Sequence, residues 1–172
     1  MLLAMIRIYL RNIVRFVVLV LLQVLLFDNI ELSGKLNPYI YVLFIILLPF
    51  ETPNWLLLIL GFFLGLSVDL FSMTPGLHAA SSLFIAFLRP FVLQNFAPRD
   101  GYETGTFPRI SFYGLNWFAK YSLVLVLSHH FILFSLEIFR LTDFGMIISK
   151  TIISGLVTTF FIIISQYFIF RK

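Results

Sequence analysis

The chain has 172 residues, of which 60% are hydrophobic and 12% are charged, with a formal net charge of +4. A soluble domain has about 25% charged residues, so this composition excludes that class and predicts an all-α integral membrane protein. The absence of cysteine excludes disulfides, thiolate metal sites and cysteine nucleophiles. The cations lie beside apolar stretches rather than in a basic soluble domain, which excludes nucleic-acid binding.

Six apolar stretches follow one another and predict one domain of six transmembrane helices. We expect the spans at about residues 13–30, 36–50, 55–72, 77–96, 118–139 and 146–170, with a cytoplasmic loop at 97–116. The second stretch is only about 20 Å long as a helix. We therefore expect it to start earlier, to continue past Pro49, or to thin the bilayer locally.

The first stretch contains Arg7, Arg11 and Arg15 at helical spacing, and we expect Gln23, within the same stretch, to bond to a neighbouring helix. No small-residue cleavage site follows it, so we interpret it as an anchor. The arginines orient the N-terminus toward the cytoplasm, and they also suit anionic lipid headgroups. With six spans and both termini in the cytoplasm, nine of the 12 Lys and Arg residues are cytoplasmic. The exceptions are Lys35, Arg140 and Lys150.

The third stretch places Gly61, Gly65 and Asp69 on one small, polar helix face. The two glycines allow close approach of another helix, although such a pair also occurs incidentally in apolar sequences. An acid in hydrocarbon costs about 2.5–3.5 kcal/mol, so Asp69 should face protein or water. A structural contact, a ligand site and a helix cap all remain open for it. Pro75 and Gly76 end the helix.

The fourth stretch carries small residues that suit the glycine face, so spans three and four should form a hairpin. These are Ala79, Ala80, Ser81, Ser82 and Ala86. Arg89-Pro90 predicts a kink, with the Arg89 guanidinium reaching the cytoplasmic headgroups. The 97–116 loop is either a docking surface for a cytoplasmic partner or an amphipathic connection facing lipid.

Four polar residues gather on the outer side of this topology: Asp69, His78, Glu137 and Lys150, with Arg140 at a similar level. We hypothesise that Lys150 meets Asp69 or Glu137 and that the four line an outer polar cavity. Alternatively, each side chain reaches the outer headgroups separately.

The histidines and the known catalytic motifs give no sign of metal or enzyme chemistry. His129 and His130 point about 100° apart on a helix, and one of them is expected to bond across helices. No metal site or cofactor is expected. No catalytic motif is present, so we expect no enzyme.

The order and spacing of several short motifs resemble the bacterial rod-shape-determining membrane protein family MreD. These are Asn37-Pro38, an apolar helix, a short turn, Gly61 to Leu66, Asp69-Leu70 and Gly76-Leu77. The resemblance covers the length, the six spans and the central half; the last third matches only in hydropathy. The family pattern falls on five candidate helix-packing or partner-binding residues, which are Pro38, Gly61, Gly65, Asp69 and Gly76. The long loop and Arg89-Pro90 depart from it.

The resemblance implies a fold similar to the S-component of energy-coupling-factor transporters and a place in the bacterial inner membrane. It implies a non-catalytic scaffold of the cell-elongation machinery that binds the transmembrane segment of the bitopic protein MreC. Indirect partners would be RodA, a penicillin-binding transpeptidase and MreB, together with membrane lipids. The alternative is a substrate-binding subunit of a small-molecule transporter, with a ligand in the outer cavity.

Overall fold

The computed structural model describes residues 2–29, 38–103, 105–139 and 143–169, with side chains from Leu10 to Phe168 within these ranges. This part of the chain is all-helical, as predicted. The long helices are α1 (Leu2–Leu22), which the π-helix η1 (Gln23–Phe27) continues, α3 (Asn54–Ser72), α4 (Leu77–Asn95), α5 (Ile110–Ile138) and α6 (Phe144–Ile169). Among the described residues, five helices are long and apolar enough to cross a membrane. They indicate a multi-pass membrane protein.

The stretch expected as the second span, 36–50, differs from a membrane-length helix in its described part. Only η2 (Ile40–Val42, a 3₁₀-helix) and α2 (Leu43–Ile46) are helical. Together they rise about 10–12 Å, against about 30 Å for a hydrocarbon core. Helical geometry ends at Leu47, two residues before Pro49, because a proline disfavours helical geometry in the residue before it.

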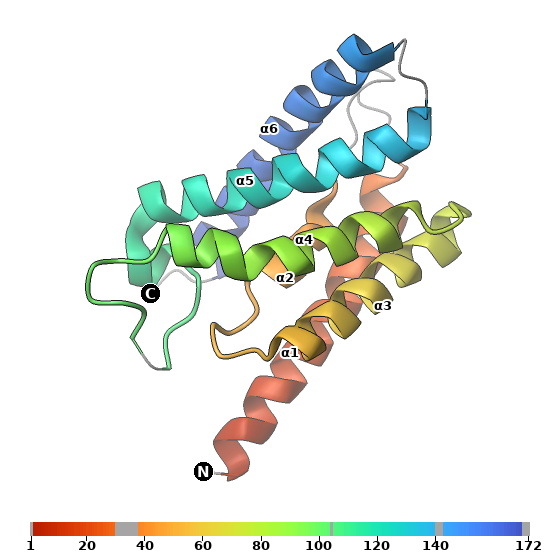
Figure 1. The fold of residues 1–172 in the computed structure, drawn as a ribbon. Coiled ribbons are helices and arrows are strands. Elements are labelled where there is room, and N and C mark those ends of the chain that lie inside the picture. The colour runs from red at the N-terminus through yellow and green to blue at the C-terminus, as the bar shows by residue number, and fades with distance from the viewer. Residues whose placement is uncertain (1, 30–37, 104, 140–142, 170–172) are drawn as a thin grey trace.

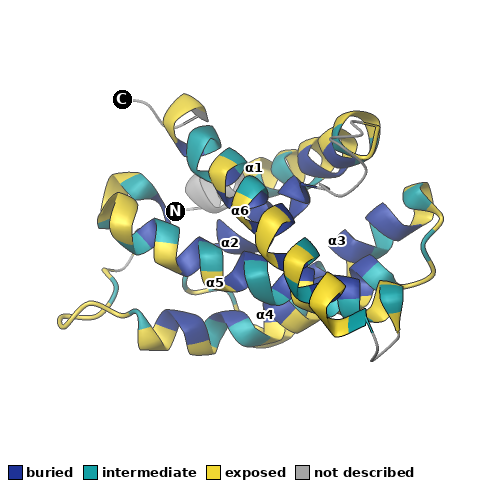
Figure 2. Cartoon of the chain, turned by 90° about the horizontal axis from the view of Figure 1, so that it is seen from above, coloured by how far each residue is buried: buried dark blue, intermediate teal, exposed yellow. Residues whose placement is uncertain are grey.

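This short stretch is the core of the molecule. From Tyr41 to Leu48, no residue is more than 2% exposed. The surrounding helices turn their exposed residues outward, and the buried ones face the centre in Figure 2. We call the residues Pro38 to Pro49 the central segment.

Helices α3 and α4 pack as the predicted hairpin and lie side by side in Figure 1. A Cβ atom added at Gly61 would lie 2.7 Å from the Cβ of Ala86 and 3.0 Å from the carbonyl oxygen of Ser82. At Gly65 it would collide with the backbone of His78 and Ala79. The glycine face therefore packs against α4 within this chain.

The bundle has two ends, which we call basal, where α1 begins, and distal, where α1 ends. The central segment runs antiparallel to α1, because its start contacts Gln23 and its end contacts Arg15. Helix α3 then runs parallel to α1, and its Ser72 hydroxyl donates to Asp28 just beyond η1 at 2.7 Å. The order of the following helices returns the chain to the basal end.

The connection expected at 97–116 is shorter than predicted, because α5 begins at Ile110. Gly114 (φ 79°) interrupts the helical geometry within α5. The connection is packed on the basal end. The Tyr102 ring stacks on Phe50 at 4.2 Å, and its hydroxyl donates to the Leu93 carbonyl at 2.7 Å. Burial raises the pKa of Tyr102 to about 12, so this hydroxyl keeps its proton at neutral pH.

Candidate functional site

The candidate site is the central segment with the side chains that bond to its two ends. A helix broken inside a membrane leaves backbone N–H and C=O groups without intrahelical partners, and each costs several kcal/mol in hydrocarbon unless the protein satisfies it. Such broken helices are common at the binding sites of membrane transporters. The side chains that bond to these backbone groups therefore indicate the role of the central segment.

At the distal end, the backbone of the central segment bonds to side chains of η1 and α6. The Gln23 amide accepts from the Ile40 N–H at 2.8 Å and donates to the Pro38 carbonyl at 3.2 Å. The Tyr39 N–H donates to the Thr158 hydroxyl at 3.0 Å. Gln23 was expected to bond to a neighbouring helix, and its bond to Ile40, the first residue of η2, agrees with this. Candidate residue Pro38 is thus held by its carbonyl.

At the basal end, the carbonyl groups that follow α2 accept from Arg89 of α4. The guanidinium donates to the carbonyls of Leu48 and Pro49, and its Nε donates to the Tyr121 hydroxyl at 2.9 Å. That hydroxyl in turn donates to the Ile46 carbonyl at 3.1 Å. Arg89 is only 2% exposed, so the expectation that it reaches the headgroups is wrong. The broken helix offers it acceptors inside the bundle, at the end where the helix dipole favours a cation.

A second arginine contributes to the same end. The Arg15 guanidinium, from α1, donates to the Leu47 carbonyl at 3.3 Å. Arginines from two different helices therefore bond to consecutive carbonyls of the central segment. This arrangement fixes the position of the segment relative to α1 and α4.

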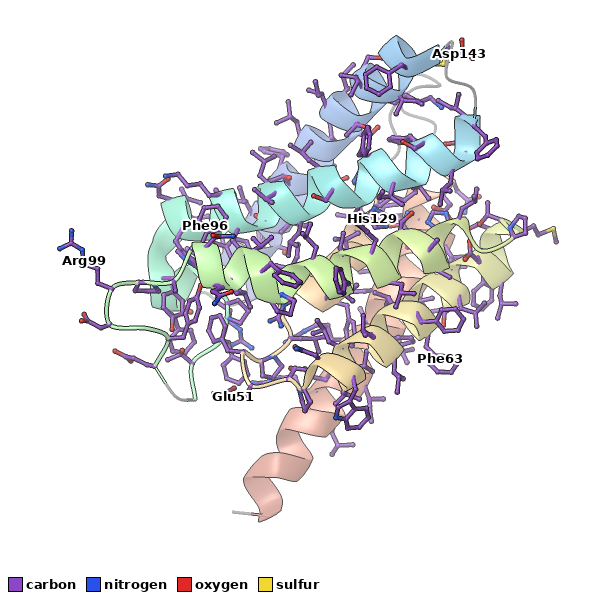
Figure 3. The ribbon with its side chains drawn as sticks, in the orientation of Figure 1. Glu51, Phe63, Phe96, Arg99, His129 and Asp143 are labelled. Atoms are coloured by element: carbon purple, nitrogen blue, oxygen red, sulfur yellow. The ribbon has the colours of Figure 1, made fainter. Side chains whose placement is uncertain are left out.

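The three histidines gather beside the central segment. The Tyr41 hydroxyl lies 2.9 Å from Nδ1 of His78 and 2.7 Å from Nε2 of His129. Figure 3 shows His129 between α5 and α4. Because one hydroxyl donates a single proton, at least one of these imidazole nitrogens donates to Tyr41 when both contacts are hydrogen bonds. Within the described residues, no group of three metal-ligating side chains could hold a metal ion.

His130 extends this network in a defined direction. Its Nδ1 lies 2.8 Å from the Val126 carbonyl and must donate there, so a neutral ring accepts at Nε2 from the Thr158 hydroxyl at 3.1 Å. Thr158 also accepts from the Tyr39 N–H. The network thus joins α5 and α6 to the backbone of the central segment.

Asp69 bonds within the α3–α4 hairpin. Its carboxylate accepts from the N–H groups of His78 and Ala79, at 3.0 and 2.8 Å, and from the Thr74 hydroxyl at 2.7 Å. Of the roles left open, this geometry is that of a helix cap at the start of α4. Gly76 serves the same turn with a φ of 83°.

The other two members of the expected outer cavity form a separate pair. Lys150 Nζ lies 3.7 Å from Glu137 Oε1, and it also lies 5.4 Å from the centre of the Phe134 ring. Of the two partners expected for Lys150, Glu137 is the one found. Arg140 and Lys35 lie outside the described residues. Two grooves in the described part of the chain have volumes of about 430 and 500 Å³. Neither is lined by Asp69, His78, Glu137 or Lys150.

Comparison with protein-family models, curated proteins and solved structures finds no match. The site is therefore interpreted from its own geometry. Sequence analysis did not single out Tyr41, Tyr121 or the inward role of Arg89. The sequence contains two signals for the inward position of Arg89. Arg89 lies inside an apolar stretch, and an earlier apolar stretch that ends near Pro49 is too short to span a membrane as a helix.

Proposed function

We propose that this chain is a non-catalytic scaffold of the bacterial cell-elongation machinery, akin to the MreD family, in the inner membrane. In this proposal it has six crossings, cytoplasmic termini and an S-component-like fold. Its direct partner is the transmembrane segment of a bitopic MreC-like protein. Through that protein it positions RodA, a penicillin-binding transpeptidase and MreB.

The course of the chain supports six crossings despite the short second helix. Five long helices alone would leave the two termini on opposite sides of a membrane. The central segment runs from the distal toward the basal end, between α1 and α3 in the chain, which supports an additional passage there. An even number of passages agrees with the distribution of Lys and Arg in the sequence.

The observation that carries the partner proposal is the open face of α1. Of the residues in the apolar stretch Leu10–Phe27, which covers most of α1 and all of η1, only 17% are buried. The apolar stretches of the other four long helices are 33–50% buried. Val14, Val18 and Leu21 are 60%, 45% and 44% exposed. Their i, i+4, i+7 spacing is that of a seam between packed helices, which fits one additional transmembrane helix.

The bonding of the buried polar groups supports a structural role. Gln23, Arg89 and Thr158 each bond to the backbone of the central segment. They hold one rigid arrangement of helices, which a scaffold needs in order to present the face of α1.

A transporter subunit that binds a small molecule is the second candidate. The observation that favours it is the broken helix with histidines beside it, since transporters bind substrates at such breaks. A ligand bound there should contact Tyr41, His78 or His129.

The test is site-specific photo-crosslinking of the full chain in native membranes. A photoreactive amino acid is placed at Val18 or Leu21 on α1, which are 45% and 44% exposed, and at Phe160 on α6, which is 61% exposed, as the control. We expect α1 positions to crosslink to a single-span protein with an MreC-like periplasmic domain, and Phe160 to give no such product. Val18→Trp should weaken co-purification of that protein, while Phe160→Trp should not.

Crosslinks from Phe160 equal to those from α1 would refute the proposed face. If the purified protein instead carries a stoichiometric small molecule that Tyr41→Phe releases, the transporter reading replaces the scaffold.

A further inference from the structure

Positive charge gathers around one aromatic ring at the basal end. The Arg11 and Arg109 guanidinium carbons lie 5.3 and 4.7 Å from the centre of the Phe107 ring. Arg15 follows one turn later on α1. Burial, together with the charges of Arg15 and Arg11, lowers the pKa of Arg109 to about 10. Three cations that repel one another are stabilised when an anion joins them.

An apolar groove opens beside these arginines. It has a volume of about 430 Å³, within the range of roughly 300–1,000 Å³ found for ligand sites. Its walls are Ile13 and Phe16 of α1 and Leu56 and Leu60 of α3, and Phe44 of α2 lies between them. A hydrocarbon chain is the chemistry that such a lining accepts.

Arg15 connects the arginines to the edge of the groove. Arg15 donates to the side-chain oxygen of Asn12, which lines the groove, at 3.4 Å. Glu51 lines the groove as well, and its carboxylate accepts from the Gly105 N–H at 3.2 Å. Figure 3 shows Glu51 beside the connection that carries Arg109. The Glu51 carboxylate thus faces that connection. Arg11 lies on α1 and is exposed.

We propose that this groove binds one anionic phospholipid, with its phosphate on Arg11 and Arg109 and an acyl chain between α1 and α3. Guanidinium groups bind phosphate oxygens through paired, charge-assisted hydrogen bonds. Basic pockets between transmembrane helices bind anionic headgroups in this way. A free phosphate would leave the apolar walls unfilled, and a zwitterionic lipid would bring no net negative charge to the three cations.

The test measures lipids that stay bound to the full chain in a neutral detergent. Equal amounts of phosphatidylglycerol and phosphatidylcholine are added, and native mass spectrometry counts each bound lipid. The variant is Arg11→Gln with Arg109→Gln. The control, Arg99→Gln with Lys120→Gln, removes the same charge at exposed positions. Leu60→Trp fills the groove without changing charge.

We expect the unchanged protein to retain phosphatidylglycerol preferentially. The double variant should retain roughly 30-fold less phosphatidylglycerol and the control should lose none, while Leu60→Trp should reduce retention of both lipids. Should the double variant fail to fold, Arg11→Gln alone must still lower retention several-fold.

Equal retention of the two lipids would overturn the proposal, and so would equal losses in the variant and the control. Stabilisation by inorganic phosphate equal to that by phosphatidylglycerol would assign the arginines to a free anion instead.

Discussion

The guanidinium of Arg89 donates to the carbonyl of Leu48, 41 positions earlier in the chain. This contact joins α4 to the point at which α2 stops. A buried arginine and a broken helix would each be costly in a membrane, and together each satisfies the other.

Replacing Arg89 by lysine should destabilise the protein by about 2–4 kcal/mol, because an ammonium cannot reproduce a fork of bonds to two carbonyls and a tyrosine. Unfolding in detergent by added dodecyl sulfate measures this difference. Arg99→Lys, at an exposed position, should change stability by less than about 0.5 kcal/mol. Equal stability of the two variants would show that the Arg89 contacts contribute little.

Gly65→Ala should destabilise the α3–α4 hairpin by about 1–3 kcal/mol, because the added methyl group meets the backbone of α4. Gly145→Ala is the matched control, since no atom lies within 4 Å of its added Cβ. It should be neutral or stabilising through helix propensity. The same unfolding measurement compares the two, and a tolerated Gly65→Ala would contradict the close packing.

Gly61 packs against α4, so a bulky substitution there affects the α3–α4 hairpin as well as any partner bound to this face. Gly61→Leu should weaken the α3–α4 hairpin itself, because the space beside Gly61 belongs to Ser82 and Ala86. Loss of partner binding in this variant should therefore come with a lower folded yield, which size-exclusion chromatography measures. Loss of the partner at an unchanged folded yield would show that the glycine face also contacts the partner.

Tyr41→Phe should cost about 1–3 kcal/mol, because it removes the hydroxyl between two buried imidazole rings and leaves their nitrogens without this partner. Tyr167→Phe removes a hydroxyl from a tyrosine that is 52% exposed and should have little effect. Thermal unfolding in detergent provides the comparison. A Tyr41→Phe protein as stable as the control would mean that the histidines do not depend on this hydroxyl.

Asp69→Asn should cost about 1–3 kcal/mol, since an amide keeps one acceptor oxygen where the carboxylate accepts three bonds with two. Asp100→Asn, in the exposed connection, is the control. Hydrogen exchange at the first turn of α4 should rise in Asp69→Asn only. Unchanged exchange there would rule out the capping role.

The sequence by itself determined the membrane class, the approximate places of the long helices and the α3–α4 hairpin. These follow from local properties: the length of apolar runs, the glycines opposite small residues, and the Pro75-Gly76 turn. Local pattern also indicated that Gln23 would have a partner in the bundle, because an amide in hydrocarbon requires one.

Only the tertiary structure decided which partner each buried or charged polar residue bonds to. Arg89 turns inward because α2 ends where its carbonyls need donors, and Asp69 caps α4 although Lys150 was an equally plausible partner by height in the membrane. Helical spacing gives the depth and face of a side chain within one helix. It does not give which face of another helix stands opposite, and that arrangement depends on the packing of the whole bundle around the central segment.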